Sequence, residues 1–511
     1  MALTDATRPT DISMLTDLYE LTMAQGLMAA GKAEEEGCFT VFFRDRPFGN
    51  AFAVMCGTAD LADLVENFRF TAQDIAYLGG LEAPAGGRLF TPEFLDYLAS
   101  FKPHVNIEAV PEGELVFPRE PMVRVSGPML ECQLLETALL NTVGFQTLAA
   151  TKAARVVLAA KGRPCAEFGL RRAQGPDGGV SVARASYVAG FSSTSNVLAG
   201  RRFGIPVFGT HAHSWVMSFS SELEAFRAFA QTMPNNCTLL IDTYDVRQGT
   251  ENAITVAHEM EARGERLSAV RIDSGDLAKL SAYVRRRFDE EGLGYVKISV
   301  SNDLDEYTIQ SLLDQGAPID SFGVGTKLAT CYDQPALGCV YKLAARRQTP
   351  AESWTPVVKL SEQPYKRTIP GYQGVMRYED AQGAPVCDMI YDVDDMAGRE
   401  AARLVAVDDA ALVADVSGLF GRELLAPVVR DGAAVSTRED VETARARCAM
   451  SLAALDKSYK RFLHPQAYLV GMEESLAQKR EQLVRARMAQ AAPAHAWAAG
   501  ESGGEGTVRP E

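Results

Sequence analysis

The chain has 511 residues, of which 47% are hydrophobic and 23% are charged, and its formal net charge is −15. The composition is typical of a soluble globular protein, and the length predicts two or three domains. The acidic balance argues against a general nucleic-acid binder, because a polyphosphate backbone would be repelled, but a local basic pocket for small anions stays compatible with it.

The chain shows no sign of a membrane segment or of export. No stretch approaches the roughly 20 uncharged apolar residues that span a bilayer. The first 13 residues have neither a basic region nor an apolar core, so they do not predict a signal peptide. The nine cysteines are scattered and form no CxxC pair, which argues against a zinc cluster or a disulfide framework. We therefore expect a cytoplasmic protein with no membrane partner.

The first 145 residues mix helix and strand patterns. Residues 14–31 predict an amphipathic helix that ends at Gly31. Apolar runs at 38–44 and 51–57, separated by a Pro-Gly turn, predict strands. A long helix is expected to begin near Pro128.

From residue 146 to 345, short β-rich runs alternate with helical stretches, which predicts a parallel sheet that is either closed into a barrel or open. The expected strands are 164–169, 206–209, 237–242, 269–273, 296–300 and 321–325. The expected helices are 180–202, 219–231, 248–263, 276–290 and 303–315.

The last part of the chain is mixed. We expect strands near 356–360 and 386–392, a third segment at 346–490 with charged helices over 437–490, and a disordered Ala/Gly/Glu-rich tail at 491–511.

Polar side chains follow nearly every strand of the middle segment. In parallel α/β folds that edge carries the active site, because the loops converge there and helix N-termini point inward. Six such strand ends predict one site, made by Arg171 and Arg172, Thr210 with His211 and His213, Asp242, Asp273 with Asp276, Ser301 with Asn302, and Gly323, Gly325 and Thr326.

The residue types at these ends favour small anions. The glycines of GVGT (323–326) let backbone N–H groups approach a phosphate, although a plain Gly-rich turn is the commoner reading of such a run. In RIDSGD (271–276) an arginine could clamp a carboxylate or phosphate, and the aspartates could bind Mg²⁺ or ribose. Asp276 could equally be a helix N-cap.

The two histidines of GTHAHS (209–214) allow structural or chemical roles. For His211 the two are evenly balanced, whereas the strand-end position of His213 favours nucleophilic or general-base service. The chain has no GxxxxGK[ST] loop and no GxGxxG after a strand, so ATP use would not rely on a P-loop, and a dinucleotide oxidoreductase is disfavoured.

Several long motifs resemble the nicotinate phosphoribosyltransferase family and occur in its order. They are LTDLYELTMAQ (15–25), QLLETALLN (133–141), EFGLRRAQGPDGG (167–179), GTHAHS, VRIDSGDL (270–277), VSNDLDE (300–306) and FGVGTKL (322–328). The resemblance implies an irregular α/β barrel of the type II phosphoribosyltransferase kind, beside an α/β sandwich domain built from both chain ends. It implies joining of nicotinate to phosphoribosyl pyrophosphate (PRPP), coupled to ATP hydrolysis, in NAD synthesis.

The resemblance also implies roles for particular residues. Tyr19 would stack on the pyridine ring from the neighbouring subunit of a homodimer with shared active sites. Thr210 and Arg271 would face nicotinate, and His213 would be the histidine that ATP phosphorylates. The remaining implied contacts are Gly323, Gly325, Thr326 and Asn302 for PRPP, Arg171 and Arg172 for pyrophosphate or carboxylate, and Asp273 and Asp276 for ribose and Mg²⁺.

Alternatives remain at this point. Nicotinamide enzymes resemble this family but carry an aspartate where this chain has Ser195, which favours the acid over the amide. Another phosphosugar-binding barrel enzyme would need a strand-end Glu or Schiff-base lysine, and Lys297 lies inside a predicted strand. A catalytically inactive member is disfavoured by the intact His213, Arg271, Asp273 and Thr326.

Overall fold

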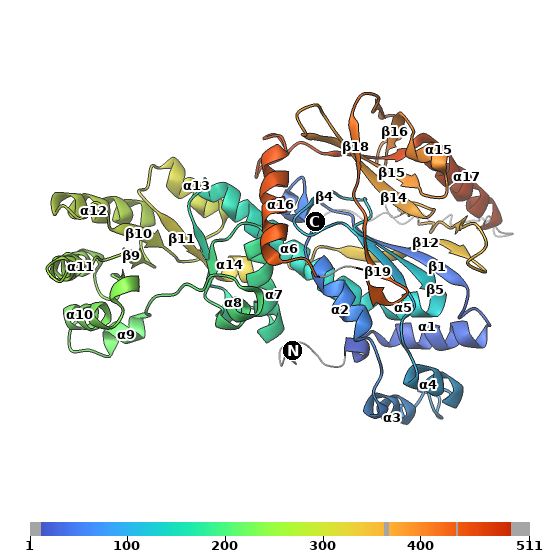
Figure 1. Cartoon of the computed structure of the whole chain (residues 1–511), viewed down its shortest axis with the longest axis horizontal. Coiled ribbons are helices and arrows are strands. Elements are labelled where there is room, and N and C mark those ends of the chain that lie inside the picture. Colours follow the sequence, from blue (N-terminus) through green and yellow to red (C-terminus); the bar gives the residue numbers. More distant parts are fainter. Residues whose placement is uncertain (1–11, 362–366, 436–437, 492–511) are drawn as a thin grey trace, which may run out of the picture.

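The computed structural model describes residues 12–361, 367–435 and 438–491. Figure 1 shows two parts side by side, one with a parallel sheet flanked by helices and one that contains the other two large sheets. Of the expected tail at 491–511, Ala491 ends a helix and the rest lies outside the described residues. Among the described residues, no helix combines the length and the apolar character needed to cross a bilayer.

One large sheet joins both ends of the chain. It has seven antiparallel strands in the order β13-β12-β1-β5-β3-β19-β20. Its strands are β1 (Glu36–Phe43), β3 (Asn106–Ala109), β5 (Val123–Pro128), β12 (Cys339–Arg347), β13 (Thr355–Pro356), β19 (Ala426–Arg430) and β20 (Ala433–Ala434). The alternation-free run GCFTVFF of β1 is buried along its whole length, as expected of a central strand covered on both faces.

Short elements of the N-terminal region surround this sheet. They are α1 (Leu18–Ala29), β2 (Ala53–Val54), α2 (Leu61–Glu66), α3 (Ala72–Gly80), α4 (Pro92–Ala99), β4 (Leu115–Val116) and α5 (Met129–Leu134). The expected helix at 14–31 and strand at 38–44 are confirmed, and the run at 51–57 forms only the two-residue strand β2.

A second, mixed sheet of six strands has the order β17-β16-β21-β15-β14-β18. It is made of β14 (Gln373–Glu379), β15 (Pro385–Asp392), β16 (Arg403–Ala406), β17 (Val413–Asp415), β18 (Phe420–Glu423) and β21 (Leu469–Glu473), with α15 (Met396–Arg399) and α17 (Glu474–Ala491) beside it. Buried Arg377 joins it to the N-terminal region, because Nη2 donates to the Leu115 carbonyl at 2.8 Å and to Asp388 at 2.6 Å. The expected sandwich built from both chain ends is confirmed.

The middle of the chain forms a parallel sheet in the order β7-β6-β11-β10-β9-β8. Its strands are β6 (Cys165–Glu167), β7 (Ser193–Thr194), β8 (Thr238–Leu240), β9 (Ala269–Ile272), β10 (Lys297–Val300) and β11 (Ser321–Val324). Strand β6 pairs with β7, the strands from β8 to β11 are neighbours in sequence order, and β11 returns to β6, as in a barrel. A bridge joins Thr194 to Val207, but no pairing among the described residues joins Val207 to β8, so complete closure stays a prediction.

Helices connect these strands. They are α6 (Glu136–Ala160), α7 (Gly175–Val188), α8 (Val197–Phe203), α9 (His213–Met217), α10 (Glu222–Thr232), α11 (Val246–Glu261), α12 (Leu277–Glu290), α13 (Glu306–Asp314) and α14 (Thr326–Ala329). The acidic or hydroxyl residue before several of them caps the helix: Asp245, Asp276 and Asp305 each accept a hydrogen bond from a backbone N–H three residues on.

Other expected elements were also wrong in extent, including the strand near 356–360, of which only Thr355–Pro356 forms. The helix over 180–202 is two helices separated by β7, because the polar run STSN leaves the helix to pair with β6. The strand at 206–209 is reduced to the single bridge at Val207. The region 437–490 contains α16 (Val441–Ala454) and α17, but β21 and a loop lie between them.

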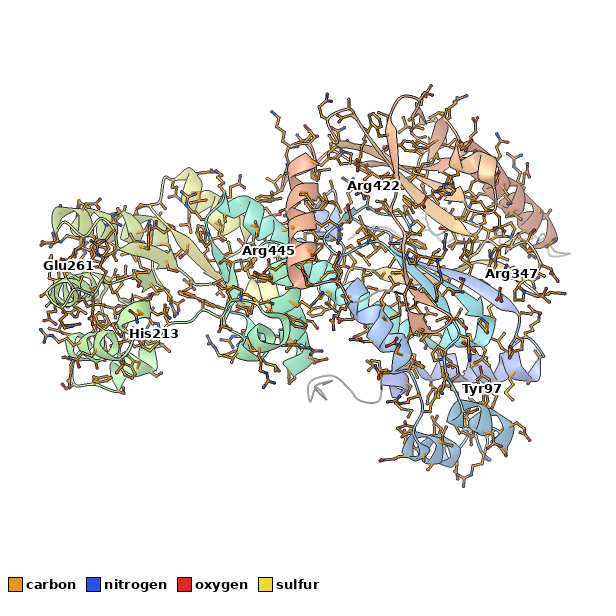
Figure 2. The ribbon with its side chains drawn as sticks, in the orientation of Figure 1. Tyr97, His213, Glu261, Arg347, Arg422 and Arg445 are labelled. Carbon is orange, nitrogen blue, oxygen red and sulfur yellow. The ribbon has the colours of Figure 1, made fainter. Side chains whose placement is uncertain are left out.

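The two parts share elements, so no simple cut in the chain separates them. Residues 145 and 146 lie inside α6, and residues 345 and 346 lie inside β12. Helix α16 packs against α7, where Arg445 donates to the carbonyls of Tyr187 at 2.6 Å and Gly190 at 3.1 Å (Figure 2). The domain boundaries expected near 145 and 345 stay predictions.

Candidate active site

The carboxyl ends of the parallel strands bring most of the predicted residues together. Thr210 and His213 follow the Val207 bridge, Asp242 follows β8, and Asp273 follows β9. Figure 2 shows His213 in the part of the molecule that contains the parallel sheet. Hydrogen bonds between these strand ends, described next, show that the loops converge as the parallel topology predicts.

Arg271 supplies a cation that has one unused hydrogen-bond donor, its Nε–H. It is the third residue of β9, and its Nη1 donates to Thr210 Oγ1 at 2.6 Å. Its Nε is buried and has no partner among the described residues. Burial lowers the pKa of the guanidinium, an effect that Asp273 and Asp242 offset, yet an arginine stays charged at neutral pH. A partly desolvated guanidinium with an unused donor suits an anionic ligand.

His213 is held between a hydroxyl and a carboxylate. Its Nδ1 lies 3.1 Å from Thr243 Oγ1, and its Nε2 lies 3.9 Å from Asp273 Oδ2. The side chain is 40% exposed, so a ligand can reach it. When Nδ1 donates to Thr243, the lone pair is on Nε2, the ring nitrogen nearer to Asp273, as a nucleophile requires.

Two aspartates and two serines connect the ends of β8, β9 and β10. Asp242 Oδ2 accepts from Asp273 N at 2.9 Å and from Ser274 Oγ at 2.6 Å, and Ser301 Oγ donates to Asp273. Asp242 Oδ1 is buried and has no partner among the described residues. These hydrogen bonds orient Asp273 and leave Oδ1 of Asp242 available to a ligand.

The two carboxylates that sequence reasoning assigned to Mg²⁺ differ in their surroundings. Asp276 caps α12, accepting from Lys279 N at 3.1 Å, and its side chain is exposed. Within the described ranges, no three or more His, Cys, Asp or Glu side chains group as a metal site. Mg²⁺ commonly takes one or two carboxylates with water and substrate phosphates, and the unpartnered oxygen of Asp242 beside Asp273 fits that mode.

His211 has a structural position. It is buried, and its Nε2 accepts from Leu240 N of β8 at 3.2 Å, where strand pairing between Val207 and β8 is missing. Burial lowers its pKa to about 4, and the nearby charges of Arg271 and His213 act in the same direction. A neutral imidazole thus replaces a strand-to-strand hydrogen bond.

At the end of β11, Gly323 lets the aromatic ring of Phe168 approach the backbone closely. A Cβ on Gly323 would lie 2.6 Å from ring atoms of Phe168. The Phe168 ring lies parallel to that of Phe208, with centroids 6.3 Å apart. Thr326 begins α14 directly after Gly325, and Asn302 after β10 has φ +101°, a strained conformation that is common at functional sites.

The β6 end carries the two arginines. Arg171 and Arg172 lie in a 3-10 turn (Leu170–Arg172) and are exposed, and in the described part of the chain neither guanidinium has a hydrogen-bond or ion-pair partner. The charge of Arg171 is near enough to Arg271 to lower its pKa. Ser195 is half-buried, and its N–H donates to the Glu167 carbonyl at 2.9 Å.

Tyr19 is not part of this edge. It lies on α1, in the other part of the molecule from α9, and is 46% exposed (Figure 1). Burial and the neighbouring Glu136 raise its pKa to about 12, so the phenol stays protonated at neutral pH. A single copy of the chain therefore does not bring Tyr19 to His213.

Sequence reasoning missed three contributors. Thr243 positions His213, Phe168 supplies an aromatic face, and buried Glu167 accepts from Thr194 Oγ1 at 2.6 Å, with a pKa raised by burial. Each lies within two residues of a predicted strand end, and that position was the available signal.

Comparisons with known proteins identify the fold and the family. Residues 14–144 match the nicotinate phosphoribosyltransferase N-terminal domain, 164–389 the nicotinate phosphoribosyltransferase family, and 372–480 its C-terminal domain. The crystal structure of human nicotinic acid phosphoribosyltransferase superposes with a TM-score of 0.80 at 32% identity, over 92% of this chain and 99% of that one. A nicotinate-nucleotide pyrophosphorylase from Pyrococcus furiosus shares the fold, with a TM-score of 0.67 at 21% identity, over 89% and 99%.

The fold is thus that of the type II phosphoribosyltransferases. Nicotinate phosphoribosyltransferase of Bacillus subtilis is 38% identical over 91% of this chain and 93% of its own length. The human enzyme is 35% identical, over 91% of this chain and 95% of its own length. The chain belongs to the nicotinate phosphoribosyltransferase family.

Proposed function

We propose that the chain catalyses attack of the nicotinate ring nitrogen on C1 of PRPP, giving nicotinate mononucleotide and pyrophosphate for NAD synthesis. Family membership supports the reaction class. The observation that carries the choice of base is Arg271, whose buried Nε lacks a partner and whose Nη1 is fixed by Thr210. A carboxylate on the pyridine ring would accept from that donor in a charge-assisted hydrogen bond, whereas an amide carbonyl would accept only in a weaker neutral one.

The surroundings of Ser195 agree with an acidic substrate. Ser195 is neutral, and the side chain of Glu167, whose backbone carbonyl accepts from Ser195 N, already accepts from Gly169 N and Thr194 Oγ1. The proposed site therefore presents no free carboxylate at this position to repel nicotinate. Phe168 offers a flat apolar face for the ring, a contact worth roughly 0.5–1.5 kcal/mol beyond burial.

ATP coupling is proposed to proceed through His213. Nε2 would attack the γ-phosphorus of ATP, forming an N–P bond and releasing ADP, and water would later cleave that bond to give phosphate. The hydrogen bond between Nδ1 and Thr243 supports this role because a ring that donates from Nδ1 carries its lone pair on Nε2. A bound Mg²⁺ would neutralise phosphate charge, with Asp242 and Asp273 as the residues that fit it.

The remaining anion contacts are proposed from position. The Gly323–Gly325 backbone, Thr326 and Asn302 would hold the 5′-phosphate of PRPP. Arg171 and Arg172, which are exposed and have no ion-pair partner in the described ranges, would face the departing pyrophosphate.

We further propose a homodimer with shared active sites, acting in the cytoplasm. The exposure of Tyr19 on a part of the molecule remote from His213 supports its supply to the neighbouring subunit. The nine cysteines are all free, which agrees with a reducing compartment.

Labelling with [γ-³²P]ATP tests the phosphohistidine. We expect acid-labile, base-stable label on the wild-type protein, none on His213→Ala, and about fivefold slower labelling of Thr243→Val, since one orienting hydrogen bond is worth about 1 kcal/mol. His258→Ala is the matched control, because His258 is half-exposed on α11 and contacts Glu261. Equal labelling of His213→Ala and the wild type would remove His213 from this role.

A further inference from the structure

A large cavity lies away from the parallel sheet. Its volume is about 1100 Å³, and it lies between β16, β21 and α17 on one side and the segments after β1 and β4 on the other. None of the strand-end residues of the candidate active site lines it. A volume of this size accommodates a nucleotide-sized molecule.

Arg480 of α17 is the most unusual group in its wall. The residue is 9% exposed, and its Nε is buried with no hydrogen-bond partner in the described part of the chain. Its other nitrogens make only long contacts, 3.9 Å from Nη1 to Met472 Sδ and 3.5 Å from Nη2 to the Arg367 carbonyl. A buried guanidinium without a carboxylate partner is costly unless a ligand supplies the anion.

Two further arginines stand beside Arg480. Arg367 also has a buried Nε without a partner among the described residues. Arg119 has a side chain that is 11% exposed and adopts φ +81°, a strained conformation for a non-glycine residue. Burial lowers the pKa of Arg480, the charges of Glu481 and Asp408 raise it, and those of Arg119 and Arg367 lower it further, so the three cations are close together.

Acidic residues of the cavity lie at its rim. Asp408 is 68% exposed in its side chain where it approaches Arg119 at 3.3 Å, and Asp45, Asp409 and Glu481 are exposed. One wall is apolar, made by Val405, Val407, Leu412, Leu469 and Val470. Buried cations beside an apolar wall match a molecule with a phosphate end and a ring.

We propose that this cavity is a second ligand site, which binds a phosphate-bearing small molecule of nucleotide size. Its phosphates lie on Arg119, Arg367 and Arg480, and its ring lies on the apolar wall. The forked donors of arginine suit phosphate oxygens, and low exposure strengthens each contact. The bound molecule connects β16, β21 and α17 to the N-terminal region, so it stabilises this part of the protein.

Hydrogen–deuterium exchange and calorimetry of the full-length protein with ADP test the proposal, with inorganic pyrophosphate as the probe for the phosphate end alone. We expect saturable binding that protects peptides from 403–412 and 469–484, and weaker binding of pyrophosphate to the same peptides. Arg480→Met and Arg367→Met each weaken this event at least tenfold. Arg485→Met, an exposed residue of the same helix, leaves it unchanged.

The outcomes separate this site from the proposed reaction. Formation of nicotinate mononucleotide without added ADP is expected to persist in Arg480→Met and Arg367→Met, because neither residue belongs to the strand-end site. Protection confined to peptides of the parallel sheet, or undiminished binding in both variants, would overturn the proposal. If Arg480→Met fails to fold, Arg367→Met decides alone.

Discussion

His211 and His213 are two residues apart but face different environments. His211 is buried and accepts from Leu240 N, whereas His213 is exposed and contacts Thr243. The sequence could place both at a strand end, but it could not tell them apart, because the difference depends on what β8 brings beside each ring. The missing strand pairing next to Val207 explains why an imidazole is needed at position 211.

His211 makes stability depend on pH. Its pKa falls from 6.5 in the unfolded chain to about 4 in the fold, so below pH 6.5 the unfolded state binds a proton that the folded state does not. The contribution of His211 to the free energy of unfolding is therefore complete above pH 6.5. It decreases as pH falls towards 4, by up to about 3 kcal/mol.

The measurement is the melting temperature between pH 7 and pH 4.5 for the wild type and His211→Phe. The variant should melt lower at pH 7, because the Leu240 N–H loses its acceptor, and should lose part of the pH dependence. Parallel curves for the two proteins would show that His211 is not the titrating group.

At the scale of elements, the sequence predicted those features that depend on the residues of a single continuous segment. Apolar runs followed by polar or glycine residues predicted β8 to β11 and the site at their ends. The two-residue strand β7 was not predicted, because STSN has no apolar pattern. The strand forms only because β6, which is distant in sequence, pairs with it. Thr243 escaped because its role exists only when His213 is beside it.

The close approach of β11 and β6 gives a prediction for Gly323→Ala. The new Cβ would lie 2.6 Å from the Phe168 ring, so that ring must shift. We expect a loss of about 1–3 kcal/mol of stability and a higher KM for PRPP and nicotinate. Gly80→Ala, which meets nothing within 4 Å at the exposed end of α3, should leave melting temperature and KM unchanged. An unchanged KM in Gly323→Ala would show that Phe168 does not shape the site.

At the scale of the whole molecule, distant segments complete one another. Arg445 of α16 holds the end of α7, and β19 pairs with β3, so the C-terminal region supports both parts. The resemblance to a known family predicted the sandwich from both chain ends, whereas local patterns did not, because such pairing leaves no signal within either segment.

The placement of Tyr19 gives a prediction for the dimer. Tyr19→Ala should raise the KM for nicotinate about tenfold, and His213→Ala should abolish the ATP-stimulated activity. If Tyr19 serves the neighbouring subunit, mixed dimers of the two variants contain one intact site. Randomly mixed subunits should then show a wild-type KM at about a quarter of the sites. Absence of that component in dimers shown to have exchanged would mean that Tyr19 does not act across the interface.

The most direct measurement of the central claim is product formation from purified protein with PRPP and Mg²⁺, given nicotinate or nicotinamide, with and without ATP. The account predicts nicotinate mononucleotide that increases with ATP, an ATP effect that is lost in His213→Ala, and little product from nicotinamide. Product from nicotinamide alone would contradict the role of Arg271, and no product from either base would contradict the proposed reaction.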